Sequence, residues 1–145
     1  MEWSPHITVA AIINEADKYL FVEERINKKI VINQPAGHLE KNETLIDAVK
    51  REVLEETGGI FKPIGLVGIY HYYHNTENKT YIRFCFQGTC HTFTKNPQLD
   101  EVIIRTIWLT KTELEAASLK LRSPIIMKCI DDYESGSSTT LDIFK

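Results

Sequence analysis

The chain has 145 residues, the size of one ordinary domain, which is long enough to bury a sizeable core. Its 17 Lys and Arg residues and 20 Asp and Glu residues give a net charge of −3, which argues against bulk electrostatic binding of nucleic acid. Hydrophobic residues make up 43% of the chain and charged residues 26%, which excludes wholesale disorder.

The cysteines and the N-terminus indicate a reducing compartment. Cys85, Cys90 and Cys129 form no C-x-x-C pair, so neither a disulfide framework nor a structural zinc site is expected. The first residues carry an acid where a signal peptide would carry Lys or Arg. The apolar stretch from Val9 to Ile13 is far too short for a membrane span. We therefore expect a cytoplasmic protein that does not associate with membranes.

The pattern of β-branched, aromatic and turn-forming residues predicts the order of elements. We expect strands at 6–13, 18–24 and 30–32, a helix at 44–57, strands at 60–74, 80–90 and 102–109, and helices at 110–117 and 123–133. Thr44, with Asp47 three residues later, predicts the start of the first helix, and Gly58 predicts its end. Thr110 and Glu113 predict the start of the second helix in the same way.

This order predicts an α/β (α+β) fold in which a mixed β-sheet is sandwiched between helices. The sequence contains no internal repeat or low-complexity tract, so residues 1–145 are expected to form a single domain. The polar run Ser135–Thr140 predicts the end of the last helix and a loose C-terminal tail from about residue 135. Trp3 and Trp108 are expected to be packing residues.

The first predicted helix carries carboxylates on its apolar side. At about 100° per residue, Leu45, Val49 and Val53 form its buried stripe. Glu52 and Glu56 fall within that stripe, where unpaired carboxylates are costly. A hard divalent cation takes oxygen ligands and supplies the opposite charge. An acidic, solvent-exposed face is the alternative, but it does not account for Glu52 and Glu56.

The spacing of residues around this helix resembles the Nudix box, G-x5-E-x7-R-E-U-x-E-E-x-G-U, where U is aliphatic. The matching residues are Gly37, Glu43, Arg51, Glu52, Glu55, Glu56 and Gly58. One position departs from the pattern, because Gly59 stands where the last aliphatic residue belongs. The likeness covers nearly the whole chain, including Leu121-Arg122-Ser123-Pro124, and is strongest to the NudJ-type phosphatases of the Nudix hydrolase family.

The resemblance implies a Nudix fold, a metal cofactor and specific site residues. The metal ligands it implies are the backbone carbonyl of Gly37 and the carboxylates of Glu52, Glu55 and Glu56. The cofactor is expected to be Mg²⁺, with Mn²⁺ as a substitute. Arg51 and Glu43 match an ion pair that braces the loop against the helix. The other interpretation of Arg51 is an ordinary exposed partner of Glu55.

The resemblance implies three catalytic residues, namely Glu55, Glu56 and Glu101. Within the box, Glu55 is a candidate general base near an activated water. Glu101 precedes a predicted strand, where proteins of this family often supply a further ligand or base. A plain acidic turn at Asp100 and Glu101 explains the same residues equally well.

Four residues are candidates for contacts with substrate: Arg25, Asn33, His38 and Arg83. Either arginine can bind a phosphate with two hydrogen bonds, whereas a strand-edge cation is the alternative for Arg83. Among the residues from Tyr70 to His74, one ring is expected to line the pocket, and the rest to form a hairpin. His71 and His74 lie on opposite faces of a strand, so a shared metal ion is not expected.

The resemblance implies Mg²⁺-dependent hydrolysis of phosphoanhydride bonds in small nucleoside di- and triphosphates or related pyrophosphates, such as hydroxymethylpyrimidine pyrophosphate. We expect broad specificity, release of orthophosphate, and a monomer or homodimer with a small-molecule substrate as its partner. One alternative is a pyrophosphohydrolase of RNA 5′ ends or dinucleotides, against which the absence of a basic stripe counts. A non-catalytic nucleotide-sensing module and a structural metal-stabilised domain remain as non-enzymatic interpretations.

Overall fold

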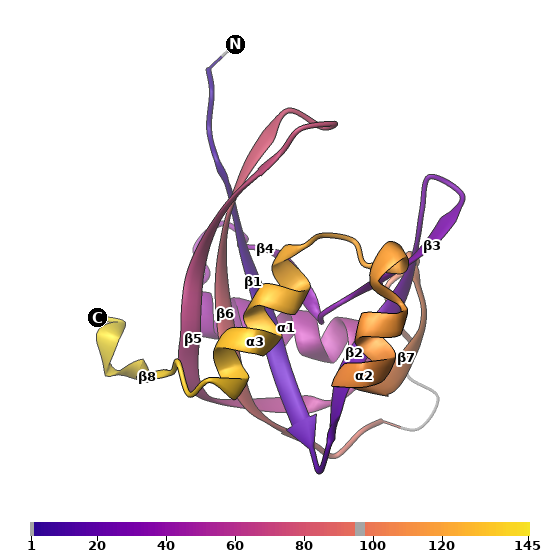
Figure 1. The fold of residues 1–145 in the computed structure, drawn as a ribbon. Coiled ribbons are helices and arrows are strands. Elements are labelled where there is room, and N and C mark those ends of the chain that lie inside the picture. Colours follow the sequence, from indigo (N-terminus) through magenta and orange to yellow (C-terminus); the bar gives the residue numbers. More distant parts are fainter. Residues whose placement is uncertain (1, 95–97) are drawn as a thin grey trace.

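The computed structural model describes residues 2–94 and 98–145 (Figure 1). The elements are β1 (His6–Glu15), β2 (Lys18–Ile26), β3 (Lys29–Asn33), β4 (Ala36–His38), α1 (Leu45–Thr57), β5 (Ile60–His74), β6 (Lys79–His91), β7 (Ile103–Thr110), α2 (Lys111–Ala116), α3 (Ile125–Glu134) and β8 (Thr139–Thr140). Single-turn 3-10 helices occupy Ser118–Lys120 and Leu141–Ile143. Among the described residues, no helix is long and apolar enough to cross a membrane.

Local sequence signals set the helix boundaries as predicted. The Thr44 side chain accepts a hydrogen bond from the Asp47 backbone N–H, and Gly58 ends α1 in the left-handed conformation with φ of 77°. At α2, Thr110 and Glu113 form both hydrogen bonds of a capping box. The sequence analysis missed β4, whose three residues are too few to show a strand period.

The strands form a mixed sheet in the order β3-β2-β1-β6-β5-β8, with β4 paired to β1 and β7 paired to β2. β1 runs parallel to β6, and the other pairings are antiparallel. β1 and β2 pair beside their connecting turn, at Asn14–Tyr19 and Glu15–Lys18. Farther from the turn, β1 pairs with β4 and β2 pairs with β3, so the two groups of strands diverge.

Helices cover both faces of this sheet, as the sequence predicted. Figure 1 shows α3 in front of the strands and α1 behind them. Val9, Ala11 and Ile13 of β1 belong to the core cluster that includes the apolar face of α1. Ile12 belongs to the other cluster, with Ile126 and further residues of α3. Alternate residues of one strand therefore face two separate cores.

The C-terminal segment forms β8 and a single 3-10 turn, where the sequence predicted a loose tail from about residue 135. Thr139 and Thr140 pair with β5, and the ring of Phe144 stacks on that of buried Phe86 with 5.4 Å between centroids. The sequence did not predict this contact, because residues 135–140 are polar and Phe144, which packs against the core, comes only after them. Trp3 was also predicted wrongly, since it is 74% exposed, whereas Trp108 packs against the core.

Candidate active site

Helix α1 places two glutamates on its buried side, as the apolar stripe predicted. Glu52 is 7% exposed and Glu56 is 4% exposed, on the face that buries Val49 and Val53. The backbone N–H of Ala36 donates to Oε1 of Glu56 over 2.8 Å. The carboxylates therefore point from the helix toward the strands rather than into solvent.

Burial makes these two carboxylates expensive to ionise. It raises the pKa of Glu52 to about 7 and the pKa of Glu56 to about 9, in both cases chiefly through loss of hydration. Arg51 offsets part of the effect at Glu52, and the Ala36 N–H offsets part of it at Glu56. A divalent cation would supply the missing positive charge, so the donor set fits a metal.

Two further carboxylates, those of Glu55 and Asp100, form an acidic cluster with Glu52. One ligand oxygen from each of Glu52, Glu55 and Asp100 lies within 4.8 Å of the other two. The backbone N–H of Asp100 donates to the carbonyl oxygen of Glu55 over 3.2 Å, which holds this loop beside the helix. Glu101 is exposed and does not belong to this cluster. The structure thus brings Asp100, rather than its predicted neighbour, to the acids of α1.

Gly37 lies against the Glu52 carboxylate. A Cβ on Gly37 would lie 2.1 Å from Cδ of Glu52, so a larger residue cannot occupy this position without moving Glu52. Pairing of Gly37 with Val9 holds β4 in this place. The glycine predicted beside the metal is therefore needed for close approach to the carboxylate.

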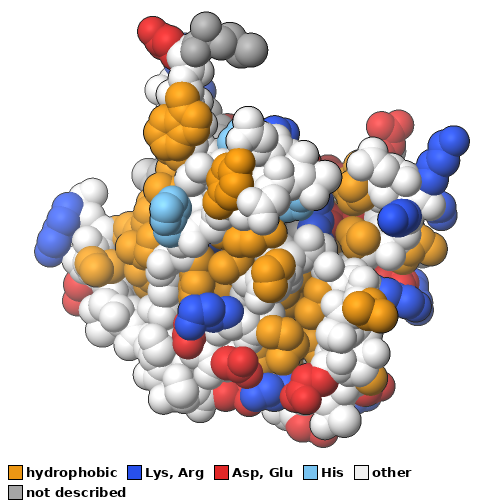
Figure 2. Space-filling model, turned by 45° about the horizontal axis from the view of Figure 1, so that its top comes forward, with side chains coloured by type: hydrophobic (Ala, Val, Ile, Leu, Met, Phe, Trp, Pro, Cys, Tyr) orange, Lys and Arg blue, Asp and Glu red, His pale blue; other side chains and the backbone are white. Residues whose placement is uncertain are grey.

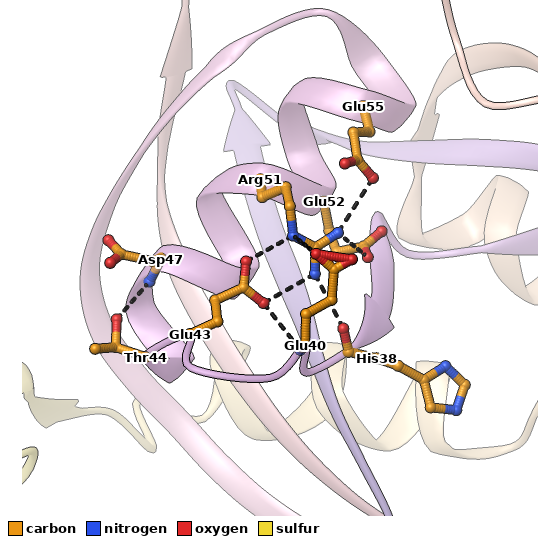
Figure 3. Close-up of polar contacts among 8 residues, drawn as sticks. All are labelled: His38, Glu40, Glu43, Thr44, Asp47, Arg51, Glu52 and Glu55. Atoms are coloured by element: carbon orange, nitrogen blue, oxygen red, sulfur yellow. Dashed lines mark hydrogen bonds and ion pairs between the residues drawn. The ribbon is translucent and has the colours of Figure 1, made fainter.

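Arg51 connects the acids of α1 to the preceding loop (Figure 3). Its Nε donates to Oε2 of Glu43 over 2.6 Å, and its Nη1 donates to Glu52 over 2.7 Å and to Glu55 over 3.2 Å. Its Nη2 donates to the carbonyl oxygen of His38 over 3.0 Å. Hydrogen bonding by Arg51 also lowers the pKa of Glu43. These contacts favour the bracing role over an exposed helix pair, because Arg51 joins the loop before α1 to two carboxylates of the helix.

A cavity of about 370 Å³ lies where the two groups of strands diverge. Glu52, Glu56 and Gly37 line it on the side of α1 and β4. Its remaining walls come from β1, β2, β3, β5 and β6, from the turn between β5 and β6, and from the start of α3 with the segment before it. The lining residues there are Thr8, Glu24, Asn33, Tyr72, His74, Glu77, Tyr81, Arg83, Arg122, Ser123 and Ile125, and Ala36, His38 and Glu40 join them beside Gly37. The volume is within the range of small-molecule sites, roughly 300–1,000 Å³.

Three of the four predicted substrate contacts line this cavity, namely Asn33, His38 and Arg83. Arg83 donates to the side-chain oxygen of buried Gln34 over 2.9 Å, which fixes its direction. Asn33 is buried, and its Oδ1 has no hydrogen-bond partner among the described residues. Arg25 does not line the cavity, because strand alternation exposes it on the face of β2 opposite Glu24.

The residues from Tyr70 to His74 of β5 alternate between the cavity side and the opposite face of the strand. Tyr72 and His74 line the cavity, and Tyr81 of β6, which pairs with Tyr72, joins them. His71 is exposed outside the cavity, so the two histidines lie on different faces of β5. Tyr70 is buried, and its hydroxyl donates to Asp132 of α3 over 2.7 Å.

Sequence reasoning missed the charged residues Glu24, Glu40, Glu77 and Arg122 of the cavity wall and Asp100 of the acidic cluster. Asp100 precedes the predicted Glu101, so the sequence identified the correct loop but the wrong residue within it. Glu24 follows Leu20 and Val22 at every second position of β2, and both of these are buried. An acid at the next position of this apolar face was the signal that could have identified Glu24. Nothing in local spacing links Arg122 to the acids.

Comparison with known proteins places these features in a family. The model of the NUDIX domain family matches residues 4–128. Phosphatase NudJ of Escherichia coli K12 is 36% identical over 141 residues, covering 97% of this chain and 91% of that protein. The structure of a NUDIX hydrolase from Nitrosomonas europaea is 45% identical, with a TM-score of 0.96, covering 98% of this chain and 97% of that one. A MutT protein from Methanosarcina mazei shares the fold at 22% identity, with a TM-score of 0.74, covering 94% and 98%.

Proposed function

Since the chain belongs to the NUDIX family of hydrolases, which act on pyrophosphate bonds, we propose that it hydrolyses small nucleoside di- and triphosphates or related pyrophosphates with Mg²⁺ and releases orthophosphate. Mn²⁺ is proposed as a substitute cofactor. Phosphatase NudJ, the similar curated protein, supports release of phosphate by its name.

The observation that carries this proposal is the placement of two buried glutamates on the cavity wall. Glu52 and Glu56 face a space of nucleotide scale, and burial raises the pKa of each. The residues proposed to hold the cation are Gly37 through its carbonyl, with Glu52, Glu55 and Glu56, and Asp100 as an added ligand. When bound, the cation offsets phosphate charge and lowers the pKa of water.

The chain's own residues would orient the reaction. Arg51 holds the carboxylates of Glu52 and Glu55 in fixed directions through Nη1. Glu55 is 39% exposed, so it can accept a proton from water and return it to solvent. Arg83, held by Gln34, presents its guanidinium to the anionic oxygens of the substrate.

The cavity supports small substrates over polyanions. Tyr72 and Tyr81 offer ring surface on which any heteroaromatic base can stack. Figure 2 shows lysines and arginines dispersed among acidic and apolar side chains on the face it presents, without a continuous basic stripe. Binding of long nucleic acid by release of counterions requires such a stripe.

The test is a panel of phosphoanhydrides with Mg²⁺, in which released phosphate is measured against released pyrophosphate. The wild-type chain should hydrolyse nucleoside di- and triphosphates with orthophosphate as the product. Glu56→Gln keeps the side-chain size and should lower turnover at saturating Mg²⁺ by at least about 100-fold. Near-normal turnover by Glu56→Gln would contradict the assigned role of this residue.

A further inference from the structure

Two guanidinium groups reach the cavity from different elements among the described residues. Arg83 comes from β6, and Arg122 comes from the segment before α3. Arg83 is tied to the neutral side chain of Gln34, whereas Arg122 is tied to a carboxylate. The role of Arg122 is therefore open to two interpretations: a counter-ion for that carboxylate, or a contact for the substrate.

The backbone of Arg122 is held firmly beside the cavity. Its N–H donates to the carbonyl oxygen of Ile32 over 2.9 Å, and the preceding Leu121 forms a β-bridge with Ile32. Arg122 therefore starts from the end of β3, next to Asn33. A fixed backbone reduces the entropy lost when its side chain binds a ligand.

The side chain of Arg122 is only partly used by the protein. Its Nη1 donates to Oε1 of Glu24 over 3.2 Å, and among the described residues the Arg122 side chain forms no other hydrogen bond or ion pair. A guanidinium has five N–H donors, and Arg122 remains 40% exposed while it lines the cavity. Glu24 itself is only 4% exposed and holds one nitrogen of Arg122, while the other guanidinium N–H groups have no hydrogen-bond partner among the described residues.

The geometry of Arg122 favours an anionic ligand for this fork, because Glu24 is the carboxylate that contacts it among the described residues and takes up one nitrogen. The acids that line the cavity are Glu24, Glu40, Glu52, Glu56 and Glu77, and a cation held by Glu52 and Glu56 would offset those two. A di- or triphosphate brings further anionic oxygens beyond those that a cation can contact. Charge-assisted hydrogen bonds from arginine to phosphate are among the stronger polar contacts in proteins.

We propose that Arg122 binds the phosphate chain of the substrate outside the metal site, and that Glu24 is a positioning residue which aims its guanidinium. This inference rests on the proposed function, because it assumes a phosphoanhydride substrate in the cavity. Arg122 would then be a second phosphate-binding residue besides Arg83, and the segment before α3 would be part of the active site.

The experiment must separate substrate binding from simple neutralisation of Glu24. We would compare Arg122→Ala in the wild-type chain with the same change in a Glu24→Gln background. Calorimetric binding of β,γ-methylene-ATP with Mg²⁺ gives affinity without turnover, and ATP hydrolysis gives kcat and KM. If Arg122 contacts phosphate, affinity should fall and KM should rise by about 10- to 100-fold in both backgrounds, with kcat changed by less than about threefold.

Arg105→Ala is the matched control. Arg105 pairs with Glu23, the neighbour of Glu24 on β2, but neither residue of this pair lines the cavity. Arg105→Ala should leave affinity and KM unchanged. Arg122→Lys, which keeps the charge but loses the planar fork, should recover part of the affinity lost in Arg122→Ala. Thermal unfolding would confirm that each variant is folded.

Glu24→Gln removes the charge but keeps a side-chain oxygen that can accept from Arg122 Nη1, so the guanidinium can still be aimed. Complete loss of the effect of Arg122→Ala in that background would therefore overturn the proposal, because Arg122 would then serve only as a counter-ion. Unchanged affinity for β,γ-methylene-ATP in Arg122→Ala would overturn it as well. Failure of the proposed function is a different result, in which the wild-type chain hydrolyses no phosphoanhydride with Mg²⁺. The analogue-binding measurement judges Arg122 in either case, because it requires no turnover.

Discussion

Gly37 and Glu52 are in direct contact, and the absence of a side chain at residue 37 allows the carboxylate to lie over β4. A Cβ at this position would lie 2.1 Å from Cδ of Glu52 and 2.2 Å from its Oε1. The obstructing atoms are the far end of a flexible side chain, so the protein can relieve the clash by moving Glu52. A side chain at residue 37 would therefore displace the Glu52 carboxylate rather than disrupt the fold.

Gly37→Ala should consequently lower metal affinity and turnover much more than stability. We expect at least about a tenfold loss of Mg²⁺ affinity, typical of a disturbed metal environment. The thermal midpoint should change little, because β4 keeps its pairing with β1. Metal titration and thermal unfolding of the same preparation check both expectations. A large fall in the midpoint with unchanged affinity would contradict this explanation.

Asp100 and Glu101 offer a matched pair of variants one residue apart. Both residues are exposed, but only Asp100 contributes an oxygen to the cluster with Glu52 and Glu55 among the described residues. Asp100→Asn should lower kcat or metal affinity by about tenfold or more, and Glu101→Gln should remain near wild type. Steady-state kinetics across a range of Mg²⁺ concentrations makes the comparison. The reverse order would return the role of ligand or base to Glu101.

Rising pH should destabilise the metal-free protein. The pKa of Glu56 in the folded chain is about 9 against an ordinary 4.5, so the folded state holds a proton that the unfolded state has released. This contribution to stability is complete below about pH 4.5 and is lost as pH rises to about 9. The slope reaches at most about 1.4 kcal/mol per pH unit for each such carboxyl.

Glu52 adds to this slope between about pH 4.5 and 7, because burial raises its pKa to about 7. Urea unfolding in the presence of a chelator, at several pH values, measures the effect. Added Mg²⁺ should flatten the dependence, since the cation stabilises the ionised carboxylates. Glu56→Gln should also flatten it without metal. A metal-free stability that increases from pH 5 to 9 would rule out the two buried carboxyls as the dominant titrating groups.

Selectivity among nucleoside triphosphates should be weak. Tyr72 and Tyr81 offer stacking surface, which every base can use. We expect kcat/KM to vary by less than about 100-fold among the common nucleoside triphosphates, the range that apolar contacts can discriminate. Parallel kinetics on the common triphosphates measures this. A preference of about 10⁴-fold would contradict it and would direct attention to the unpaired Oδ1 of Asn33.

Much of the acidic half of the site could be predicted because it is local. Glu52 and Glu56 lie one helical turn apart, so the helical periodicity of α1 places both on the same face. That face is apolar, and buried carboxylates on it require a compensating charge. The cap at Thr44 and the end at Gly58 are likewise set by neighbouring residues. The order of strands and helices followed from the same short-range signals.

Of the two arginines that line the cavity, Arg83 was predicted but Arg122 could not be, because its place depends on contacts far apart in the chain. Arg122 meets Glu24 across 98 residues, through a segment whose position depends on its pairing with Ile32. The sequence pattern favoured Arg25, but a shift of one residue along β2 turns a side chain to the other face. Glu24 therefore lies in the cavity, while its neighbour is exposed to solvent.

The docked C-terminal segment covers part of an open sheet edge. β8 pairs with β5 at Gly65 and Leu66, on the side of β5 away from β6. Unpaired edge strands offer free N–H and C=O groups to other chains, and Pro63 already removes one donor from this strand. Removing residues 137–145 would uncover the edge and the ring of Phe86, so shortened chains should self-associate before they lose their fold.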